Sequence, residues 1–383
     1  MKRLVSEHVE NSKLYPPGRP IEEVKRKYGI EEVVKLNSNE NCLGPSPMAL
    51  KAVTESVREI YRYPDNSAFY LKRKLAEKNG VSPEQIILGN GSNELVQFII
   101  MTFLVPGEEV VTGRPTFLLY GIMGRVLGGR VKEIPLKDFS FDLESMATQI
   151  AKDTKLIFIS NPNNPTGTIV TDDSFRRFMG KVPGDVIVVM DEAYFEYVTS
   201  SDFPESLEYV NKKRNIIILR TFSKAYGLAG LRIGYAIAPA RLTSYMERIR
   251  EPFNANCLAQ KAALAALDDT EHVERTRENN RIGLEYIYAQ LKKLQLSFVP
   301  TQANFLLVNV GPKADTVYRM LLKEGIMVRS MSSFELNEHI RVTVGLPEEN
   351  KKFIDALERV IEGINMGTLD NSLPKHNSES IFL

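Results

Sequence analysis

One lysine of the chain stands where its amine would be reactive. Lys224 follows a continuous apolar run, residues 216–219, and lies next to Ser223. Most lysines are solvated on the surface, but a desolvated lysine near other cations loses its proton readily and becomes a nucleophile for carbonyl groups. The Gly and Ala residues that surround Lys224 leave room for a planar ligand. The sequence therefore predicts a nucleophilic lysine at this position.

A carboxylate follows the most apolar run of the sequence. Asp191 comes directly after residues 186–190, and Tyr194 follows it by three residues. A carboxylate in this place is partly desolvated and needs a cationic or N–H partner. A helix cap or an internal salt bridge is the alternative to a functional role. We expect the side chains of Asp191 and Tyr194 to reach one cavity.

An arginine interrupts a β-branched segment near the C-terminus. Arg341 lies within residues 339–343, where an unpaired charge would be costly. A carboxylate held by two parallel hydrogen bonds is its natural partner. That carboxylate belongs either to a ligand or to an Asp or Glu of the chain.

Two loops have compositions that fit a binding site. Residues 89–94, Gly-Asn-Gly-Ser-Asn-Glu, follow an apolar run and lead into a helical pattern. Backbone N–H groups at such a helix start favour an anion, although a tight turn with a Ser or Asn cap is the alternative. Residues 161–167 hold Asn163 and Asn164 between two prolines, which fix the backbone on either side. Taken alone, this second loop is more typical of an ordinary turn.

The elements that must position these residues alternate between strands and helices. Short apolar runs at 85–88, 109–111, 156–159, 186–190 and 216–219 are separated by helical patterns such as 93–103 and 172–179. Continuous apolarity is typical of strands buried on both faces of a parallel sheet. Four of the five motifs follow such runs, and ligands of open α/β sheets bind at the carboxyl ends of the strands. We expect an α/β domain with a mostly parallel sheet flanked by helices.

The pattern of predicted helices and strands changes after about residue 259. One long helical stretch, 258–294, precedes strand patterns at 304–308 and 339–344 and helical patterns at 314–324 and 348–364. This order predicts a smaller α+β domain. The expected division is an N-terminal arm at 1–34, a large domain at 35–265, a small C-terminal domain at 266–365 and a polar tail at 366–383.

Composition excludes several classes of function. The formal net charge is +1, which argues against a nucleic-acid or membrane-surface partner. The 2 Cys and 4 His are far apart in sequence, so neither a metal site nor a disulfide framework is expected. The longest apolar run, 95–105, is far shorter than the ~18 residues of a spanning helix. The N-terminus lacks the apolar stretch of a secretory signal. These features predict a soluble, cytoplasmic protein.

The motifs together resemble a known family. Residues 163–167 (Asn-Asn-Pro-Thr-Gly), residues 191–194 (Asp-Glu-Ala-Tyr), and Ser223-Lys224 followed eight residues later by Arg232 have the order of fold-type I pyridoxal-phosphate aminotransferases, class I/II. Within that group the chain is most similar to histidinol-phosphate aminotransferases, and further similar segments include 17–24, 36–41, 62–65, 115–117, 251–254 and 302–305. The resemblance extends from about residue 15 to residue 364. It implies pyridoxal 5'-phosphate as the cofactor.

The resemblance implies roles for residues around that cofactor. Lys224 would bond covalently to the cofactor aldehyde and then move a proton at the substrate Cα, and Asp191 would keep the pyridine nitrogen protonated. Asn164 and Tyr194 would donate hydrogen bonds to the ring hydroxyl oxygen. The remaining cofactor-binding residues would be Phe117 on the ring, and Gly91, Ser92, Asn93, Ser223, Arg232 and, from the neighbouring subunit of a homodimer, Tyr63.

The resemblance also implies a reaction. Arg341 would bind the substrate carboxylate, Arg329 the distal phosphate of the amino donor, and Tyr15 would close over the substrate, with Asn41 as a further substrate-binding residue. The expected reaction is transfer of the amino group from L-histidinol phosphate to 2-oxoglutarate, giving imidazole acetol phosphate and L-glutamate, in histidine biosynthesis. The sequence departs from the family's usual residues at Cys42, Asn93 and 330–336, so the identity of the amino donor stays open.

Alternatives remain on the same scaffold and outside it. An aromatic amino acid aminotransferase and a phosphothreonine decarboxylase would share the cofactor residues. A nicotinamide-dependent oxidoreductase is disfavoured because Glu94 stands where the third glycine of its phosphate-binding motif would be. A non-catalytic binding protein is disfavoured because every expected reactive position is filled.

Overall fold

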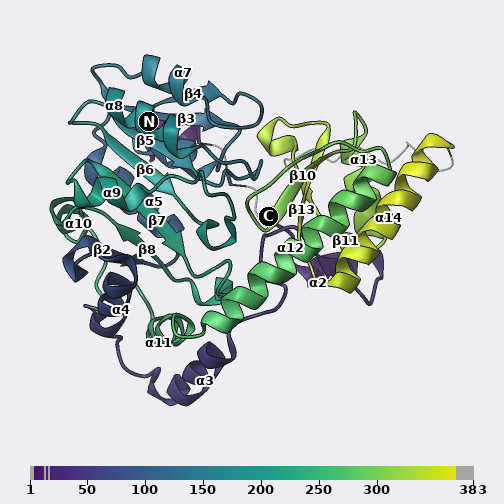
Figure 1. The fold of residues 1–383 in the computed structure, drawn as a ribbon, viewed down its shortest axis with the longest axis horizontal. Coiled ribbons are helices and arrows are strands. Elements are labelled where there is room, and N and C mark those ends of the chain that lie inside the picture. Colours follow the sequence, from purple (N-terminus) through teal and green to yellow (C-terminus); the bar gives the residue numbers. More distant parts are fainter. Residues whose placement is uncertain (1–3, 13, 16–17, 368–383) are drawn as a thin grey trace.

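The computed structural model describes residues 4–12, 14–15 and 18–367. At its centre is a seven-stranded sheet in the order β2-β8-β7-β6-β5-β3-β4, on the left of Figure 1. Only β8 runs antiparallel to its neighbours within this sheet, so the predicted mostly parallel sheet is confirmed. The strands are β2 (Ile86–Gly89), β3 (Glu109–Arg114), β4 (Arg130–Pro135), β5 (Thr154–Ser160), β6 (Ile187–Asp191), β7 (Ile216–Thr221) and β8 (Gly234–Ile237).

Helices cover both faces of this sheet. Every residue of β6 and β7 is buried, which explains their continuous apolar sequences. One face packs against α5 (Ser92–Phe103), α6 (Leu119–Val126) and α10 (Ala240–Met246). The other packs against α4 (Phe69–Asn79), α7 (Leu143–Thr148), α8 (Asp172–Lys181), α9 (Ser206–Asn211) and α11 (Cys257–Ala266). The helix α3 (Pro47–Ser56) lies along α11.

The expected long helix at 258–294 is two helices. The chain leaves α11 at Ala266 and begins α12 (Thr270–Lys293) after Asp269, whose carboxylate accepts a hydrogen bond from His272 N at 3.2 Å. An Asp at this position satisfies a free N–H group of the new helix and so favours a fresh helix start. The prediction of one continuous helix was wrong because it followed the helical spacing and overlooked this cap.

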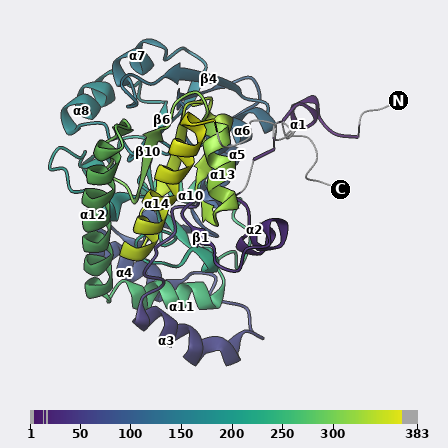
Figure 2. The ribbon, with the colours of Figure 1, turned by 90° about the vertical axis from the view of Figure 1, so that its right-hand side faces the viewer.

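The C-terminal part forms a second layer of strands and helices. Its antiparallel sheet has the order β12-β13-β10-β9. Figure 2 shows α12, α13 and α14 side by side over this unit. Their apolar side chains share one core with the sheet, and the expected α+β unit is confirmed. The elements are β9 (Phe298–Val299), β10 (Phe305–Asn309), α13 (Ala314–Lys323), β12 (Arg329–Ser330), β13 (His339–Thr343) and α14 (Pro347–Asn365).

The N-terminal segment packs on the C-terminal unit. The short strand β1 (Val34–Lys35) pairs in parallel with β11 (Ile326–Met327). The helix α2 (Ile21–Tyr28) buries Val24 against Leu322 and Met327. The helix α1 (Glu7–Glu10) lies near α6. Residues 1–3, 13 and 16–17 of the expected arm and 368–383 of the expected tail lie outside the described residues. Among the helices of the described part, none is long and apolar enough to cross a membrane.

Candidate active site

The loops that follow the parallel strands meet the C-terminal unit around one cavity. The segments after β2, β3, β5, β6 and β7 all contribute to its walls, and the cavity has a volume of about 290 Å³. Of the residues predicted from the sequence, the structure brings the following to its lining: Tyr15, Ser92, Asn93, Phe117, Asn164, Asp191, Tyr194, Ser223, Lys224, Arg232, Arg329 and Arg341. The site lies at the carboxyl ends of the strands, as expected for an open α/β sheet.

Lys224 lies in this cavity just beyond the end of β7. Its Nζ donates a hydrogen bond to the backbone oxygen of Ser38 at 3.2 Å. Burial lowers the pKa of Lys224 to about 8, and the positive charges of Arg341 and Arg232 act in the same direction. A substantial fraction of its amine is therefore neutral near pH 8, and a neutral amine is the nucleophilic form.

Asp191 ends strand β6 inside the same cavity. Its Oδ2 accepts a hydrogen bond from the hydroxyl of Tyr120 at 2.6 Å, and its Oδ1 accepts one from Ala193 N at 3.2 Å. Burial raises the pKa of Asp191 to about 6, although the Tyr120 hydrogen bond opposes this rise. A buried carboxylate with a raised pKa gains free energy when a cation comes to it. Asp191 is therefore suited to hold a protonated ring nitrogen.

A polar cluster surrounds the hydroxyl of Tyr194. The hydroxyl oxygen accepts hydrogen bonds from Asn39 Nδ2 at 2.9 Å and from Asn164 Nδ2 at 3.4 Å. Burial raises the pKa of Tyr194 to about 12, so the phenol keeps its proton at neutral pH. The amide oxygen of Asn164 accepts a hydrogen bond from Arg341 Nη1 at 2.6 Å. These contacts leave the Tyr194 proton available for an acceptor in the cavity.

An anion-binding end is built from α5 and the loop after β7. Ser92 and Asn93 occupy the first turn of α5, where backbone N–H groups lack partners within the helix. Gly91 has φ = 80°, and a Cβ built there would lie 2.3 Å from Arg232 Nη2. The guanidinium of Arg232 donates to Ser223 Oγ at 3.4 Å and to Ala229 O at 3.0 Å, and in the described part of the chain it forms no ion pair. This end can therefore hold a dianion such as a phosphate.

Two arginines of the small sheet also line the cavity. Arg329 on β12 and Arg341 on β13 are directly paired residues of adjacent strands. Arg341 donates to Asn37 O at 2.8 Å, and burial lowers its pKa to about 10. Its Nε is buried and has no hydrogen-bond partner among the described residues. Among the described residues, the hydrogen bonds of Arg341 go to neutral oxygens and it has no carboxylate partner, so its charge remains available for a ligand.

Aromatic side chains form the remaining wall. The rings of Tyr15 and Phe117 meet edge to face with centroids 6.1 Å apart. Phe117 in turn meets Tyr120 edge to face at 5.4 Å, and Tyr120 stacks on Phe158 at 4.7 Å. Phe334 also lines the cavity. This wall gives the cavity an apolar surface suited to a planar ring.

Three predicted site residues, Gly91, Asn41 and Tyr63, do not line the cavity. Gly91 lies directly before the lining residue Ser92 and packs against Arg232. The amide of Asn41 donates to Ala225 O at 2.9 Å and to Thr276 Oγ1 at 3.0 Å, which joins the loop before α3 to α12. Tyr63 is 83% exposed and its ring stacks on Phe253 with centroids 4.7 Å apart. Tyr63 is thus placed on the surface of the single chain, where a neighbouring subunit can approach it.

Among the residues of the site that were not singled out from the sequence, two contact a predicted catalytic residue through their side chains. Tyr120 contacts Asp191, and Asn39 contacts Tyr194. Asn39 lies in the segment 36–41 that carries part of the resemblance, so that segment was a signal for it. Tyr120 follows Phe117 by three residues at the start of α6, and this helical spacing was the available signal.

The second acid of the Asp-Glu-Ala-Tyr motif points away from the cavity. Glu192 Oε2 accepts hydrogen bonds from Arg220 Nε at 3.0 Å and Nη2 at 2.9 Å, and both side chains are buried. The guanidinium of Arg220 also lies 3.6 Å from the centroid of the Phe195 ring. This ion pair fixes the backbone beside Asp191, so only the first acid of the motif faces the ligand.

Comparisons with known proteins agree with this arrangement. The family model "Aminotransferase class I and II" matches residues 31–357. The chain is 47% identical over 356 residues to the histidinol-phosphate aminotransferase of Moorella thermoacetica. The aligned region covers 93% of this chain and 92% of that protein. It is 46% identical to histidinol-phosphate aminotransferase 2 of Carboxydothermus hydrogenoformans, over 94% of this chain and 99% of that protein.

A solved structure has the same fold. The crystal structure of histidinol-phosphate aminotransferase from Sinorhizobium meliloti in complex with pyridoxal-5'-phosphate matches with a TM-score of 0.87 and 27% identity, over 94% of this chain and 98% of that one. The aspartate aminotransferase of Thermus thermophilus with maleate, at 24% identity and a TM-score of 0.82, shares the fold. The family match over most of the sequence, the identities of its relatives and the shared fold show that this chain belongs to the class I and II aminotransferases.

Proposed function

We propose that the chain binds pyridoxal 5'-phosphate in this cavity and transfers the amino group of L-histidinol phosphate to 2-oxoglutarate. The residues present fit the cofactor at each of its ends. The first turn of α5 with Ser223 and Arg232 fits its phosphate, Asp191 fits its ring nitrogen, and Lys224 fits its aldehyde. When bound, the cofactor supplies an electron sink for negative charge at the substrate Cα.

The residues of the chain would share the remaining work. Lys224 would bind the cofactor covalently. Once the amino donor displaces it, its amine would take the proton from the substrate Cα and deliver it to the cofactor carbon. Asp191, oriented by Tyr120, would keep the ring nitrogen protonated. Tyr194 would donate its hydroxyl proton to the ring oxygen, because Asn39 and Asn164 already donate to its own oxygen.

The cationic wall supports a donor that carries a phosphate. Histidinol phosphate has a phosphate and no carboxylate, whereas glutamate has two carboxylates. One site must therefore bind two patterns of anions. Arg329 and Arg341, side by side on β12 and β13, provide two guanidinium groups in the same cavity. Guanidinium binds phosphate and carboxylate alike through paired hydrogen bonds. The names of the relatives at 46–47% identity point to the same donor.

The observation that carries the proposal is a buried lysine with a lowered pKa in one cavity with Asp191 and Arg232. Lys224→Ala should lower transamination by about 10²–10⁴-fold, the usual contribution of a positioned acid–base group. Lys51→Ala, at an exposed helical position, is the control and should keep wild-type activity. A Lys224→Ala variant that keeps the wild-type rate of transamination would contradict the proposal.

The choice of donor is tested at Arg329. Arg329→Ala should reduce kcat/KM for histidinol phosphate more than kcat/KM for phenylalanine, since only the first carries a distal phosphate. Equal losses for the two donors would remove the phosphate-binding role. The aromatic wall of Tyr15, Phe117 and Phe334 favours an aromatic amino acid aminotransferase as the second candidate. Wild-type protein that prefers phenylalanine over histidinol phosphate would support that candidate.

We propose a homodimer as the functional form. Tyr63 would reach the cofactor phosphate of the neighbouring subunit, because it is highly exposed and stands outside the cavity of its own chain. Further exposed apolar side chains lie close to it along the chain or against its ring: Ile60, Tyr61, Phe69 and Tyr70, and Phe253, which stacks on it. Such a patch is typical of an interface between protein chains.

A further inference from the structure

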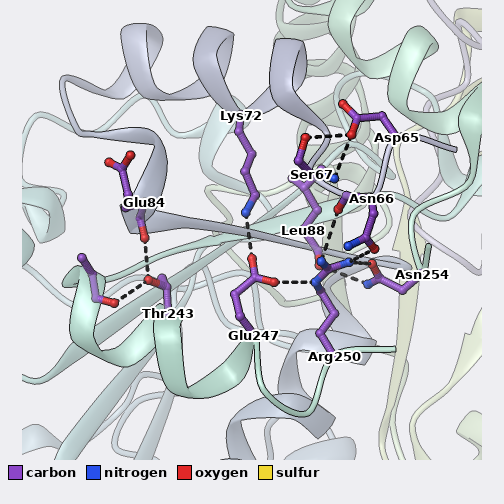
Figure 3. A network of polar contacts seen from close by, with 11 residues as sticks. Asp65, Asn66, Ser67, Lys72, Glu84, Leu88, Thr243, Glu247, Arg250 and Asn254 are labelled. Atoms are coloured by element: carbon purple, nitrogen blue, oxygen red, sulfur yellow. Dashed lines mark hydrogen bonds and ion pairs between the residues drawn. The ribbon is translucent and has the colours of Figure 1, made fainter. Parts of the chain in front are cut away.

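A continuous set of polar contacts joins the surface loop that carries Tyr63 to the N-terminus of α5. We call residues 61–68 the Tyr63 loop. Figure 3 shows Asn66 of this loop meeting Arg250, which in turn meets Asn254, whereas Asp65 and Ser67 meet each other. Arg250 and Asn254 lie beyond α10. The mechanism described above uses none of these contacts.

At the surface end, Asn66 fixes the residue on which Tyr63 rests. Asn66 Oδ1 accepts a hydrogen bond from Phe253 N at 2.8 Å. The backbone of Phe253 has φ = 63°, a left-handed conformation that is unfavourable for a bulky residue. Its ring stacks on Tyr63 with an interplanar angle of 23°. The Asn66 hydrogen bond therefore helps to hold this backbone, and with it the Phe253 ring, against Tyr63.

In the middle, the guanidinium of Arg250 joins the loop to Asn254. It donates to the Asn66 side chain and backbone oxygens, both at 3.2 Å, and to Asn254 Oδ1 at 2.9 Å. Its Nε donates to Glu247 Oε2 at 2.6 Å, and Glu247 also pairs with Lys72 at 2.8 Å. The Arg250 side chain is only 12% exposed, so these contacts are largely shielded from water.

At the inner end, Asn254 holds the loop that precedes α5. Its Nδ2 donates to Leu88 O at 3.2 Å and to Glu94 Oε2 at 2.6 Å. The same carboxylate oxygen accepts a hydrogen bond from Asn90 N at 2.7 Å. Glu94 thereby closes the turn that brings Gly91 against Arg232 and directs the first N–H groups of α5 into the cavity.

We propose that Arg250 and Asn254 are positioning residues for the cofactor phosphate on both sides of the dimer. One framework sets the phosphate-binding turn of its own subunit through Glu94 and sets Tyr63, which serves the partner's phosphate, through Asn66 and Phe253. The inference rests on the proposed function, because it takes the phosphate as the ligand and Tyr63 as a residue that acts across the interface. It adds a physical link between the two phosphate sites.

The link predicts coupled effects on cofactor affinity. Asn254→Ala should raise the Kd for pyridoxal 5'-phosphate about tenfold, the size expected for loss of a hydrogen bond to a charged group. Tyr63→Phe should also raise it. The fold-increase in Kd of the double variant should be smaller than the product of the two single fold-increases, because Asn254→Ala has already displaced Tyr63.

The experiment is a titration of the dimeric apoprotein with pyridoxal 5'-phosphate, together with thermal unfolding of the apoprotein. Lys261→Met is the control, since it removes only an exposed ion pair with Glu59, and its Kd should match the wild type. Arg250→Lys keeps the charge but loses the planar fork, and it replaces Asn254→Ala if that variant does not fold.

Two results would overturn this inference and leave the proposed function standing. One is an unchanged Kd in Asn254→Ala with a lowered unfolding temperature, which is a structural role only. The other is a double variant whose fold-increase in Kd equals the product of the two single fold-increases, which means that Asn254 and Tyr63 act independently. A wild-type protein that takes up no pyridoxal 5'-phosphate would instead overturn the proposed function, and the inference with it.

Discussion

Lys224 and Asp191 have pKa values displaced toward one another by the same physical cause. Burial penalises the charged form of each group, so it lowers the pKa of the amine to about 8 and raises the pKa of the carboxyl to about 6. Both groups therefore titrate close to neutrality. Perturbed groups that share a cleft are typical of catalytic sites.

The lowered pKa of Lys224 predicts the pH dependence of cofactor capture. Only the neutral amine attacks an aldehyde, and the neutral fraction grows about tenfold per pH unit below the pKa. The rate of uptake of pyridoxal 5'-phosphate by the apoprotein should therefore rise with pH and level off above about 8. The change in visible absorbance after mixing measures this rate. A rate that climbs steadily to pH 10 would indicate an unperturbed lysine.

Tyr120 gives a second prediction at the scale of a residue. Tyr120→Phe removes a 2.6 Å hydrogen bond that holds down the pKa of Asp191. The pKa of Asp191 should rise further above about 6, so activity should fall more at pH 6 than at pH 8. The pH profile of kcat/KM reports this shift. Tyr209→Phe, whose ring packs on the far face of the sheet, is the matched control and should leave the profile unchanged.

At the scale of the element, the N-terminus of α5 depends on one glycine. Gly91 has a positive φ, where a side chain costs roughly 1–2 kcal/mol, and a Cβ there would overlap Arg232. Gly91→Ala should weaken binding of pyridoxal 5'-phosphate at least about tenfold through both effects. Gly230→Ala is the control, because nothing lies within 4 Å of a Cβ at that position. Similar Kd values for the two variants would show that this turn does not shape the phosphate site.

The elements of the central sheet were predictable where burial alone decides them. The runs at 156–159, 186–190 and 216–219 became β5, β6 and β7 because strands buried on both faces must be continuously apolar. The strands β1, β11 and β12 are two residues long, and only pairing with distant segments defines them. No local pattern marks such pairings in advance.

The same distinction applies to the site. The segments after the parallel strands were expected at one edge of the sheet, and they do line one cavity. Tyr120 and Asn39 were not foreseen, because their contacts with Asp191 and Tyr194 join residues 71 and 155 positions apart. The roles of the catalytic, cofactor-binding and substrate-binding residues stay predictions, as do the domain boundaries at 34, 265 and 365.

At the scale of the whole molecule, the proposed homodimer, in which Tyr63 reaches the site of the neighbouring subunit, predicts complementation. Tyr63→Ala and Lys224→Ala subunits each lack one part of the machinery. A mixed dimer should regain one complete site, in which Lys224 of the first subunit meets Tyr63 of the second. Mixing the two unfolded variants and refolding them at limiting cofactor should therefore give more activity than the sum of the separate proteins. Simple additivity would place Tyr63 outside the partner's site.

We propose that the cavity exchanges an amino group between a phosphorylated donor and a keto acid. The most direct measurement is product analysis of the wild-type holoenzyme with histidinol phosphate, phenylalanine or phosphothreonine as donor and 2-oxoglutarate as acceptor. Histidinol phosphate should have the highest kcat/KM and should yield one glutamate for each 2-oxoglutarate consumed. Release of CO2 from phosphothreonine without consumption of 2-oxoglutarate, and no reaction of histidinol phosphate, would contradict it.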